Sequence, residues 1–308
     1  MHIAVVVPAY NVAAFLPDAM RSVLRQTHTS WTMIVVDDGS TDATPAVAAT
    51  FQDSRIVLIR QANAGVSAAR NRGIHRAGDS APDAFLFLDG DDWLVPDALA
   101  RLAGTLDAAP WAVAACGRYA RVAAGGGAIR LSPAPPDGCL LERLLIRNLF
   151  ANGGHLLIRR EAIETAGDFR RDLTYGEDWE YWTRLAMLGE FAAVRGRSPL
   201  LFVRERAGSA YRVNAADPAA YRPVIDAIHR NPAVASRIGS ARLADLTDRA
   251  GAEIAWTVGR ELIRHGSRQD GVLWLVRSLR QAPSLKRLIV AGLSWRQTGP
   301  FAPYRTPV

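Results

Sequence analysis

The fold of this chain is decided by one stretch, Phe85-Leu86-Phe87-Leu88-Asp89-Gly90-Asp91-Asp92-Trp93. Its leading apolar residues are typical of a strand buried inside a parallel sheet. Carboxylates follow where that strand must end, and open α/β sheets bind their ligands at the carboxyl ends of the strands. The spacing of Asp89 and Asp91 lets two carboxylates converge on one hard cation such as Mg²⁺ or Mn²⁺, and that cation could hold a diphosphate. A turn followed by a helix capped at Asp92 accounts for the same residues without a ligand.

Strands and helices alternate through the first third of the chain. We expect strands over residues 3–8, 31–36, 56–59 and 84–88, with a helix after each one. Ser40 or Thr41 is expected to cap the second helix, and the fourth helix is expected over residues 96–108. This alternation predicts a right-handed, doubly wound sheet whose four strand ends lie along one edge. Polar or glycine-containing segments fall at those ends: Pro8 to Asn11, Asp37 to Ser40, Asn63 to Gly73 and Asp89 to Asp91.

The pattern changes after residue 110. Trp111 to Tyr119 predicts a strand, Gly125 to Gly127 a hairpin tip or loop, Glu177 to Leu188 a helix, and Leu200 to Arg204 a last strand. From about Ala215 onward every periodic segment is helical. We therefore expect an α/β domain over residues 1–212, divided into a nucleotide-binding half (1–110) and an acceptor half (111–212). A helical C-terminal region over residues 213–308 follows it.

Composition narrows the class of protein. The 308 residues are 49% hydrophobic and 22% charged, as in ordinary soluble globular proteins. The net charge of +7 is compatible with nucleic acid, anionic lipid or phosphorylated substrates, and it does not choose among them. Cys116 and Cys139 are expected to be reduced thiols in the core. The first residues read as a strand rather than a secretion signal, and no apolar run is long enough to span a membrane, so we expect a cytoplasmic chain with at most peripheral membrane contact.

Two familiar nucleotide motifs are missing from the start of the chain. There is no G-x-G-x-x-G fingerprint and no G-x-x-x-x-G-K loop, which argues against nicotinamide-dependent enzymes and P-loop NTPases. The segments that are present resemble the family 2 glycosyltransferases, which have the GT-A fold. The resemblance covers roughly residues 1–210 and rests on five blocks: Val7-Pro8-Ala9-Tyr10-Asn11, Val36-Asp37-Asp38-Gly39-Ser40-Thr41-Asp42, Asn63-Ala64-Gly65-Val66-Ser67-Ala68-Ala69-Arg70-Asn71-Arg72-Gly73, Leu88-Asp89-Gly90-Asp91-Asp92 and Gly176-Glu177-Asp178-Trp179-Glu180.

The resemblance implies a fold and a reaction. The fold is α/β of GT-A type, which is Rossmann-like with a mostly parallel sheet covered by helices on both faces, here followed by a C-terminal helical appendage. The reaction is an inverting, metal-dependent transfer of a sugar, of hexosyltransferase type. The donor is a nucleotide-diphosphate sugar, with a UDP-sugar favoured, and the acceptor is a hydroxyl of a glycan or lipid-linked molecule in cell-surface polysaccharide synthesis. Processive members carry Q-x-x-R-W and membrane spans; the chain has neither, so a single addition is expected.

The resemblance also implies residues for the donor and the metal. Asp38 would accept a hydrogen bond from the imide N–H of the base, and Arg70 would meet the base or a phosphate. Asp91 would ligate Mn²⁺ or Mg²⁺ on the diphosphate, while Asp89 would bind the metal or the hydroxyls of sugar or ribose; the spacing does not decide between them. The whole set of nucleotide and donor residues is Pro8, Tyr10, Asp38, Arg70, Asp89, Gly90, Arg204 and Arg206. A turn with a helix cap remains the alternative for Asp38, and a solvated charge the alternative for Arg70.

The catalytic base implied by the resemblance is Asp178. The alternative is a plain charge preference, because acids at the start of a helix are favoured by its dipole. The implied acceptor residues are Gly153, Gly154, Glu177 and Trp179; Trp179 has a second interpretation as a core residue, and His155 is expected to be structural. Arg204 to Ser209 is similar to a basic segment that closes over the diphosphate, although the family often has His where this chain has Arg206.

The C-terminal segment and two rival functions complete the predictions. From Gly271 to Val308 the chain has six cations and no acid, interleaved with apolar residues. Such a segment can lie on an anionic membrane surface, or it can pack on the catalytic domain or in a homodimer. The rival enzyme is a sugar-phosphate nucleotidyltransferase, which requires a glycine-rich loop that Pro8 to Asn11 does not supply. The rival from another class is a basic nucleic-acid-binding or scaffold protein, motivated by the charge alone.

Overall fold

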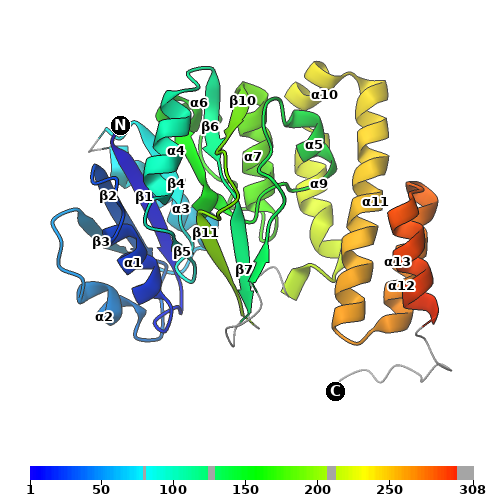
Figure 1. Ribbon diagram of the computed structural model, residues 1–308, viewed down its shortest axis with the longest axis horizontal. Coiled ribbons are helices and arrows are strands. Elements are labelled where there is room, and N and C mark those ends of the chain that lie inside the picture. The colour runs from blue at the N-terminus through cyan, green and yellow to red at the C-terminus, as the bar shows by residue number, and fades with distance from the viewer. Residues whose placement is uncertain (79–80, 124–128, 207–212, 297–308) are drawn as a thin grey trace. The chain divides into compact units, whose positions relative to one another are not determined.

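The computed structural model describes residues 1–78, 81–123, 129–206 and 213–296 (Figure 1). The chain divides into two compact units. An α/β unit comprises Met1–Leu141 and Leu149–Arg206, and a helical unit comprises Glu142–Asn148 and Ala207–Val308. The predicted site residues all belong to the α/β unit.

The α/β unit is built on a seven-stranded sheet in the order β10-β6-β9-β4-β1-β2-β3. Its strands are β1 (Ile3–Ala9), β2 (Trp31–Asp37), β3 (Ile56–Arg60), β4 (Ala84–Phe87), β6 (Ala112–Cys116), β9 (Leu156–Arg159) and β10 (Glu190–Ala193). The first four are parallel to one another, and β9 runs antiparallel between β4 and β6. Every residue of β1 and β4 is buried, which is why both read as uninterrupted apolar runs. The predicted doubly wound, mostly parallel sheet is confirmed.

Helices cover both faces of this sheet. They are α1 (Leu16–Leu24), α2 (Thr44–Ala49), α3 (Val66–Ala77), α4 (Ala98–Asp107), α6 (Arg160–Ala166) and α7 (Glu177–Leu188). Leu16 of α1 and Leu102 of α4 share one core with Val5 and Val7 of β1. The neighbouring β1 residue Val6 points to the opposite face, where it packs against Gly73 of α3. This alternation along β1 follows from the two-residue repeat of a strand.

A second sheet includes the strand that follows the acidic turn after β4. It has the order β5-β11-β7-β8 and consists of β5 (Trp93–Leu94), β11 (Leu201–Glu205), β7 (Tyr119–Ala123) and β8 (Ile129–Leu131). Leu94 and Trp93 pair antiparallel with Leu201 and Phe202. This pairing brings the basic end of β11 beside the acidic turn after β4.

Several local predictions were wrong. The strand expected over residues 111–119 is two strands in different sheets, β6 and β7. The fourth helix begins at Ala98, because Trp93 and Leu94 form β5 instead of leading into a helix. Neither Ser40 nor Thr41 caps a helix, since α2 begins at Thr44. Cys116 is buried and Cys139 is exposed, so only one of these two cysteines lies in the core. The hairpin glycines 125–127 lie outside the described residues.

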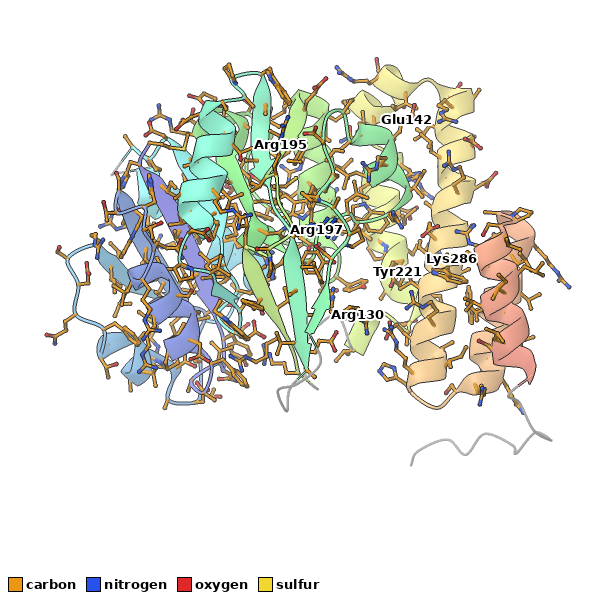
Figure 2. All side chains as sticks on the ribbon, viewed as in Figure 1. Arg130, Glu142, Arg195, Arg197, Tyr221 and Lys286 are labelled. Carbon is orange, nitrogen blue, oxygen red and sulfur yellow. The ribbon has the colours of Figure 1, made fainter. Side chains whose placement is uncertain are left out.

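The helical unit contains only helices among the residues that the structure describes. They are α5 (Leu141–Ile146), η3 (Pro218–Tyr221), α9 (Arg222–His229), α10 (Pro232–Ile238), α11 (Ser240–Arg264), α12 (Arg268–Gln281) and α13 (Leu285–Arg296). Trp256 of α11, Leu275 of α12 and Ala291 of α13 form a small core. Glu142 of α5, labelled in Figure 2, pairs with Arg242 of α11 at 2.6 Å. Within the described part of the chain, no helix combines the length and hydrophobicity needed to cross a membrane.

Candidate active site

The acidic turn after β4 packs directly on the end of β1. A Cβ atom added to Gly90 would lie 3.2 Å from the carbonyl oxygen of Pro8 and 3.2 Å from a methyl group of Val12. A larger side chain would therefore push the turn away from the strand end. The close packing of Gly90 on Pro8 therefore holds the acidic turn against the end of β1, and this structural role does not depend on a ligand.

The turns after β1 and β2 are joined by hydrogen bonds. Thr41 N–H donates to the side-chain oxygen of Asn11 at 2.9 Å, and Asn11 N–H donates to the Ser40 hydroxyl at 3.0 Å. Asn11 has a φ of 50°, which an asparagine tolerates better than most residues. Its neighbour Tyr10 is 47% exposed. The tyrosine ring is therefore accessible at the edge where a nucleotide base is expected.

Asp38 is buried and shapes the loop that precedes α3. Its Oδ1 accepts hydrogen bonds from Gln61 Nε2 at 2.8 Å and Ala64 N–H at 2.9 Å, and its Oδ2 accepts one from Gly65 N–H at 2.8 Å. A carboxylate oxygen has two lone pairs. Among the described contacts, one acceptor position is therefore left at Oδ2. Asp38 holds the loop, and its contact with a base stays a prediction.

Arg70 connects two parts of the predicted site. Its side chain is only 4% exposed; Nη2 donates to Asp89 Oδ1 at 3.0 Å, and Nη1 donates to Glu177 Oε1 at 2.9 Å. The guanidinium also lies 5.3 Å from the centre of the Phe169 ring. Burial works against the charge of Arg70, but Asp89 and Glu177 outweigh it and raise its pKa. Arg70 is therefore a permanent buried cation between the acidic turn and α7, and the interpretation as a solvated charge is wrong.

Asp91 and Asp92 have different partners. Arg206 Nε donates to Asp91 Oδ2, and Arg204 Nε donates to the Asp91 carbonyl oxygen at 3.1 Å. Asp92 is buried and accepts from Asn152 Nδ2 at 2.6 Å and from Arg204 N–H at 2.8 Å. Burial raises the pKa of both carboxyls; Asp89 adds to this effect at Asp91, and Asp91 and Asp89 both add to it at Asp92. The prediction that Asp92 caps the next helix was wrong, because α4 begins six residues later.

Asp178 lies in the first turn of α7, next to the Arg70 pair. Its Oδ1 accepts a hydrogen bond from Trp179 N–H at 2.6 Å. Burial is the largest cause that raises the pKa of Asp178, the charge of Glu177 adds to it and the charge of Arg70 opposes it, and the pKa is about 7 as a result. A carboxyl with this pKa can accept and release a proton near neutral pH. A helix-dipole preference explains why acids begin α7, but it does not explain the pairing of Glu177 with Arg70.

The predicted acceptor loop is packed under the acidic turn. Gly153 and Gly154 form a buried turn, η2 (Gly153–His155). His155 is held by the Gly117 carbonyl oxygen at 2.8 Å and by Ala151 N–H at 3.2 Å, and burial lowers its pKa to about 4. It is therefore neutral and bonded into the fold. Trp179 is 4% exposed. Of its two interpretations, the structure supports the one in which Trp179 is a core residue.

Arg204 is held in place by contacts on several sides. Its Nη2 donates to Asp18 of α1 at 2.8 Å. Its guanidinium lies 5.0 Å from the ring centre of Phe15 and 4.7 Å from that of Trp93. The sequence does not predict this contact of Asp18, because nothing in its local pattern links it to a residue 186 positions away. Ser209, the end of the predicted basic segment, lies outside the described residues.

The acidic turn has the donor chemistry that a divalent cation needs. Among the described residues there is no cluster of three or more metal-ligating side chains. Nucleotide sites, however, hold Mg²⁺ or Mn²⁺ with one or two carboxylates plus the phosphates and water. The Asp89 and Asp91 side chains keep 29% and 15% of their surface exposed. In the described part of the chain, the carboxylates of residues 89, 91, 92 and 177 outnumber the guanidinium groups of Arg70 and Arg206 that form ion pairs with them, so the residues present fit a bound cation.

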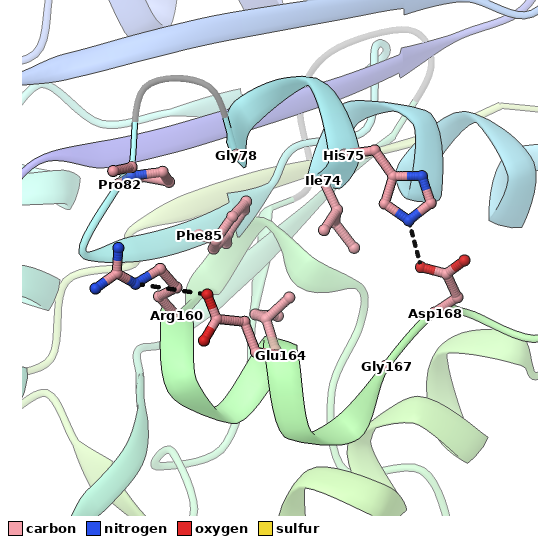
Figure 3. Close-up of a pocket in the computed structure, with 11 residues that line it drawn as sticks. Ile74, His75, Gly78, Pro82, Phe85, Arg160, Glu164, Gly167 and Asp168 are labelled. Atoms are coloured by element: carbon pink, nitrogen blue, oxygen red, sulfur yellow. Dashed lines mark hydrogen bonds and ion pairs between the residues drawn. The ribbon is translucent and has the colours of Figure 1, made fainter.

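A cavity of about 340 Å³ lies elsewhere in the α/β unit (Figure 3). The end of α3, the start of β4 and α6 line it. His75 and Asp168 form a pair at its rim at 2.9 Å, and Arg160 and Glu164 form another at 3.7 Å. Phe85, which also lines it, is at the start of β4, whereas Asp89 follows the end of that strand. None of the predicted site residues lines this cavity.

Curated relatives and solved structures are similar to this chain. It is 41% identical over 97 residues to glycosyltransferase GlyA of Streptococcus pneumoniae, covering 31% of this chain and 14% of GlyA. It is 35% identical over 119 residues to the uncharacterised glycosyltransferase EpsJ of Bacillus subtilis, covering 38% of this chain and 34% of EpsJ. The chain thus spans about a third or less of the length of these relatives.

Two solved structures share the fold. TarS 1–349 of S. aureus in complex with UDP-GlcNAc has a TM-score of 0.58 at 17% identity, over 96% of this chain and 92% of that one. The mannosyltransferase PcManGT of Pyrobaculum calidifontis, in complex with GDP-Man and Mn²⁺, has a TM-score of 0.59 at 19% identity, over 96% and 79% of the two chains. The fold is that of the GT-A enzymes. The model of glycosyl transferase family 2 matches residues 4–167, and the chain belongs to that family.

Proposed function

We propose that this chain is an inverting, metal-dependent glycosyltransferase. It transfers a sugar from a nucleotide-diphosphate donor, with a UDP-sugar favoured, to a hydroxyl of a glycan or lipid-linked acceptor in cell-surface polysaccharide synthesis. One observation carries the proposal. Arg70 joins Asp89 to Glu177, so the acidic turn that would hold the donor lies beside the carboxyl that would take the proton, Asp178.

The donor half of the proposal rests on Asp38 and Tyr10. The acceptor position left at Asp38 Oδ2 suits the imide N–H of a base, and the exposed ring of Tyr10 lies at the same edge. TarS and PcManGT were both solved with nucleotide-diphosphate sugars, which supports this class of donor. Uracil and guanine both carry a ring N–H at this edge, so Asp38 alone does not choose between them.

Asp91 and Asp89 are the proposed metal ligands. A bound Mn²⁺ or Mg²⁺ would neutralise the charge that develops on the leaving diphosphate. The Mn²⁺ in the PcManGT complex supports a divalent ion. Arg206, which bonds to Asp91, supplies a permanent positive charge at the same place and suits a phosphate as its second partner.

Asp178 is the proposed catalytic base. In its ionised form it removes the proton from the acceptor hydroxyl while that oxygen attacks the anomeric carbon, and the bond from that carbon to the diphosphate breaks. A single displacement from the face opposite the leaving group inverts the anomeric configuration. Glu177, fixed by Arg70, keeps the first turn of α7 in position for this step.

The helical unit is proposed to bring the enzyme to a lipid-linked acceptor on the cytoplasmic face of the cell membrane. Leu285, Leu288, Ile289 and Leu293 are 73%, 56%, 50% and 55% exposed, and their spacing places them on one face of α13. From Gly271 to Arg296 the chain has cations and no acid. This charge favours anionic lipid and opposes contact with the same face of a second copy.

Two measurements test the proposed function. Thermal unfolding with UDP plus Mn²⁺ should show stabilisation of about 2.7 kcal/mol at 100 times the dissociation constant, whereas a generic oligonucleotide should give none. A panel of nucleotide sugars should then show hydrolysis or transfer with one donor. Stabilisation by the oligonucleotide alone would point to the nucleic-acid-binding rival. Turnover of a nucleoside triphosphate with a sugar phosphate would point to the nucleotidyltransferase.

A further inference from the structure

Asp92 is a buried carboxylate whose two oxygens are both used. Its side chain is 2% exposed; Oδ2 accepts from Asn152 Nδ2 at 2.6 Å, and Oδ1 accepts from the backbone N–H of Arg204 at 2.8 Å. These partners belong to the loop before η2 and to β11. Asp92 therefore fastens the acidic turn to two segments that are distant in the sequence.

Asn152 makes a second connection through the same amide. It is 5% exposed, and Nδ2 donates to Asp89 Oδ2 at 3.1 Å in addition to Asp92. Its Oδ1 accepts from Gly154 N–H at 2.9 Å. These three bonds set the orientation of the amide, because the opposite orientation would place its oxygen against two carboxylates. Asn152 thus bonds to Oδ2 of Asp89, whereas Arg70 bonds to Oδ1 of the same carboxylate.

The loop that carries Asn152 has no space to move towards the strand. A Cβ added to Gly153 would lie 2.7 Å from the Phe87 Cβ and 3.0 Å from the Phe87 carbonyl oxygen. Phe87 ends β4, two residues before Asp89. The position of the amide relative to the acidic turn is therefore set by tight backbone packing.

We propose that Asp92 and Asn152 are positioning residues for the donor: Asp92 orients the Asn152 amide, and that amide fixes the carboxylate of Asp89. The inference rests on the proposed function, in which Asp89 contacts the donor or its metal. Neither residue contacts the substrate in this scheme. Their effect reaches the reaction through Asp89.

Exchanging the two residues separates this role from a purely structural one. Asp92→Asn leaves either the Asn152 amide or Arg204 N–H without an acceptor, and Asn152→Asp places a third carboxylate beside Asp89 and Asp92. In the double variant Asp92→Asn, Asn152→Asp, the new Asn can donate to the new Asp and still accept from Arg204 N–H. The new Asp can still accept from Gly154 N–H. Only the bond to Asp89 is lost, and a like charge replaces it.

The experiment compares the full-length wild type, both single variants and the double variant. Each is measured by its thermal unfolding temperature and by KM and kcat for the nucleotide sugar with Mn²⁺. Both single variants should lose stability. The double variant should recover most of the unfolding temperature, while its KM for the donor stays raised about tenfold or more and kcat changes less. That separation between restored stability and raised KM is the result expected of a positioning role.

Gln26→Glu is a matched control. Gln26 is also a buried amide that makes three bonds, to the Ser22 and Val95 carbonyl oxygens and from Leu99 N–H, and these partners do not include Asp89, Asp92 or Asn152. This change should lower stability and leave the donor KM unchanged. The proposal is overturned if the double variant regains wild-type KM together with its stability, or if the single variants alter stability alone. If the wild type neither binds nor turns over any nucleotide sugar, the proposed function fails instead, and the stability pattern still reports on the hydrogen bonds.

Discussion

Arg206 donates a hydrogen bond to the carboxylate of Asp91, the aspartate we propose as a metal ligand. A divalent ion that binds Asp91 Oδ2 must compete with this guanidinium for the same oxygen. In the proposed function, the displaced arginine would then contact the diphosphate of the donor. Arg206 is therefore expected to weaken metal binding at Asp91 and to strengthen binding of the donor.

Replacing Arg206 should separate these two effects. In Arg206→Met, Asp91 loses its competitor, so the Mn²⁺ concentration for half-maximal activity should fall several-fold. The donor KM should rise about tenfold, because a cation next to the phosphates is lost. Both values come from titrating metal and donor in a transfer assay. Arg197→Met, which changes an exposed arginine labelled in Figure 2, serves as the control; parallel changes in both quantities would contradict the competition.

Asp178→Asn should abolish transfer and leave donor binding intact. The amide keeps the shape of the side chain but cannot accept the proton, and removal of a general base costs about 10²- to 10⁴-fold in rate. Turnover is measured at saturating donor, and UDP binding by calorimetry. Asp172→Asn, an exposed acid in the loop before α7, should retain both properties. Retained turnover in Asp178→Asn would overturn the assignment of the base.

The rate should depend on the ionisation of the same carboxyl. The pKa of Asp178 is raised to about 7, chiefly by burial. Since the base works in its ionised form, kcat/KM should fall about tenfold per pH unit below pH 7. A profile flat down to pH 5 would show that another group takes the proton.

Stability should change with pH in the opposite sense. A carboxyl whose pKa is raised by folding stabilises the native state below its unfolded value of 3.8, and this contribution is lost as the pH rises through about 7. Wild-type protein should therefore lose more stability between pH 5 and pH 8 than Asp178→Asn, which cannot ionise. Urea unfolding of both proteins at the two pH values measures the difference. Equal losses would show that Asp178 is not the group responsible.

Arg70→Met should destabilise the fold as well as the reaction. The change leaves the Asp89 and Glu177 carboxylates without their common buried cation, and breaking a buried pair in this way costs about 3–5 kcal/mol of unfolding free energy. Arg70→Lys restores a charge without the two-sided geometry of a guanidinium, so it should recover part of the stability and little of the activity. Urea denaturation and initial rates test both variants. A loss below about 1 kcal/mol in Arg70→Met would contradict the role of this residue as the link.

Vesicle binding tests the exposed face of α13. The full-length double variant Lys286→Glu, Leu288→Gln should co-sediment with phosphatidylglycerol vesicles at least about tenfold less than the wild type, since one cation near a charged surface is worth about 1 kcal/mol and burial of an apolar side chain adds to it. Neutral phosphatidylcholine vesicles should bind both proteins weakly. Val213→Gln, at an exposed apolar residue outside α13, is the matched control. If the wild type forms a dimer but does not bind vesicles, and the double variant is monomeric, a second copy of the chain is the partner of this face instead of a membrane.

The sequence predicts much of the sheet and of the edge that carries the site. β1, β2 and β4 are apolar runs of strand length, and α7 begins and ends at the predicted residues. Each of these features depends on a pattern of residues within one short segment of the chain. Because neighbouring strands are parallel, their carboxyl ends lie along the same edge of the sheet. The sequence alone therefore predicts that Asp38, Asp89 and Asp91 lie at one edge.

The connections within the site could not be predicted in this way. Nothing local to Asp92 indicates that it bonds to Asn152, which is 60 residues away, or to the backbone of Arg204, which is 112 residues away. The same holds for the bond from Arg70 to Glu177 across 107 residues. Trp179 could not be assigned from the sequence either, because its position in the helix is compatible with stacking on a sugar and with a place in the core. Its burial depends on the segments that pack around α7.

The sequence by itself determined the family, the alternating strands and helices of the nucleotide-binding half and the acids at the strand ends, since each is set by residue type and short spacing. Tertiary structure alone decided which of those acids are paired. A carboxylate after Phe85-Leu86-Phe87-Leu88 can cap a helix, hold a loop or face a ligand, and the difference lies in donors supplied by remote segments. Pairing β5 with β11 and packing Gly153 on Phe87 brought Arg204 and Asn152 to Asp92. Through these two residues, Asp92 connects the acidic turn to distant segments of the chain instead of capping a helix.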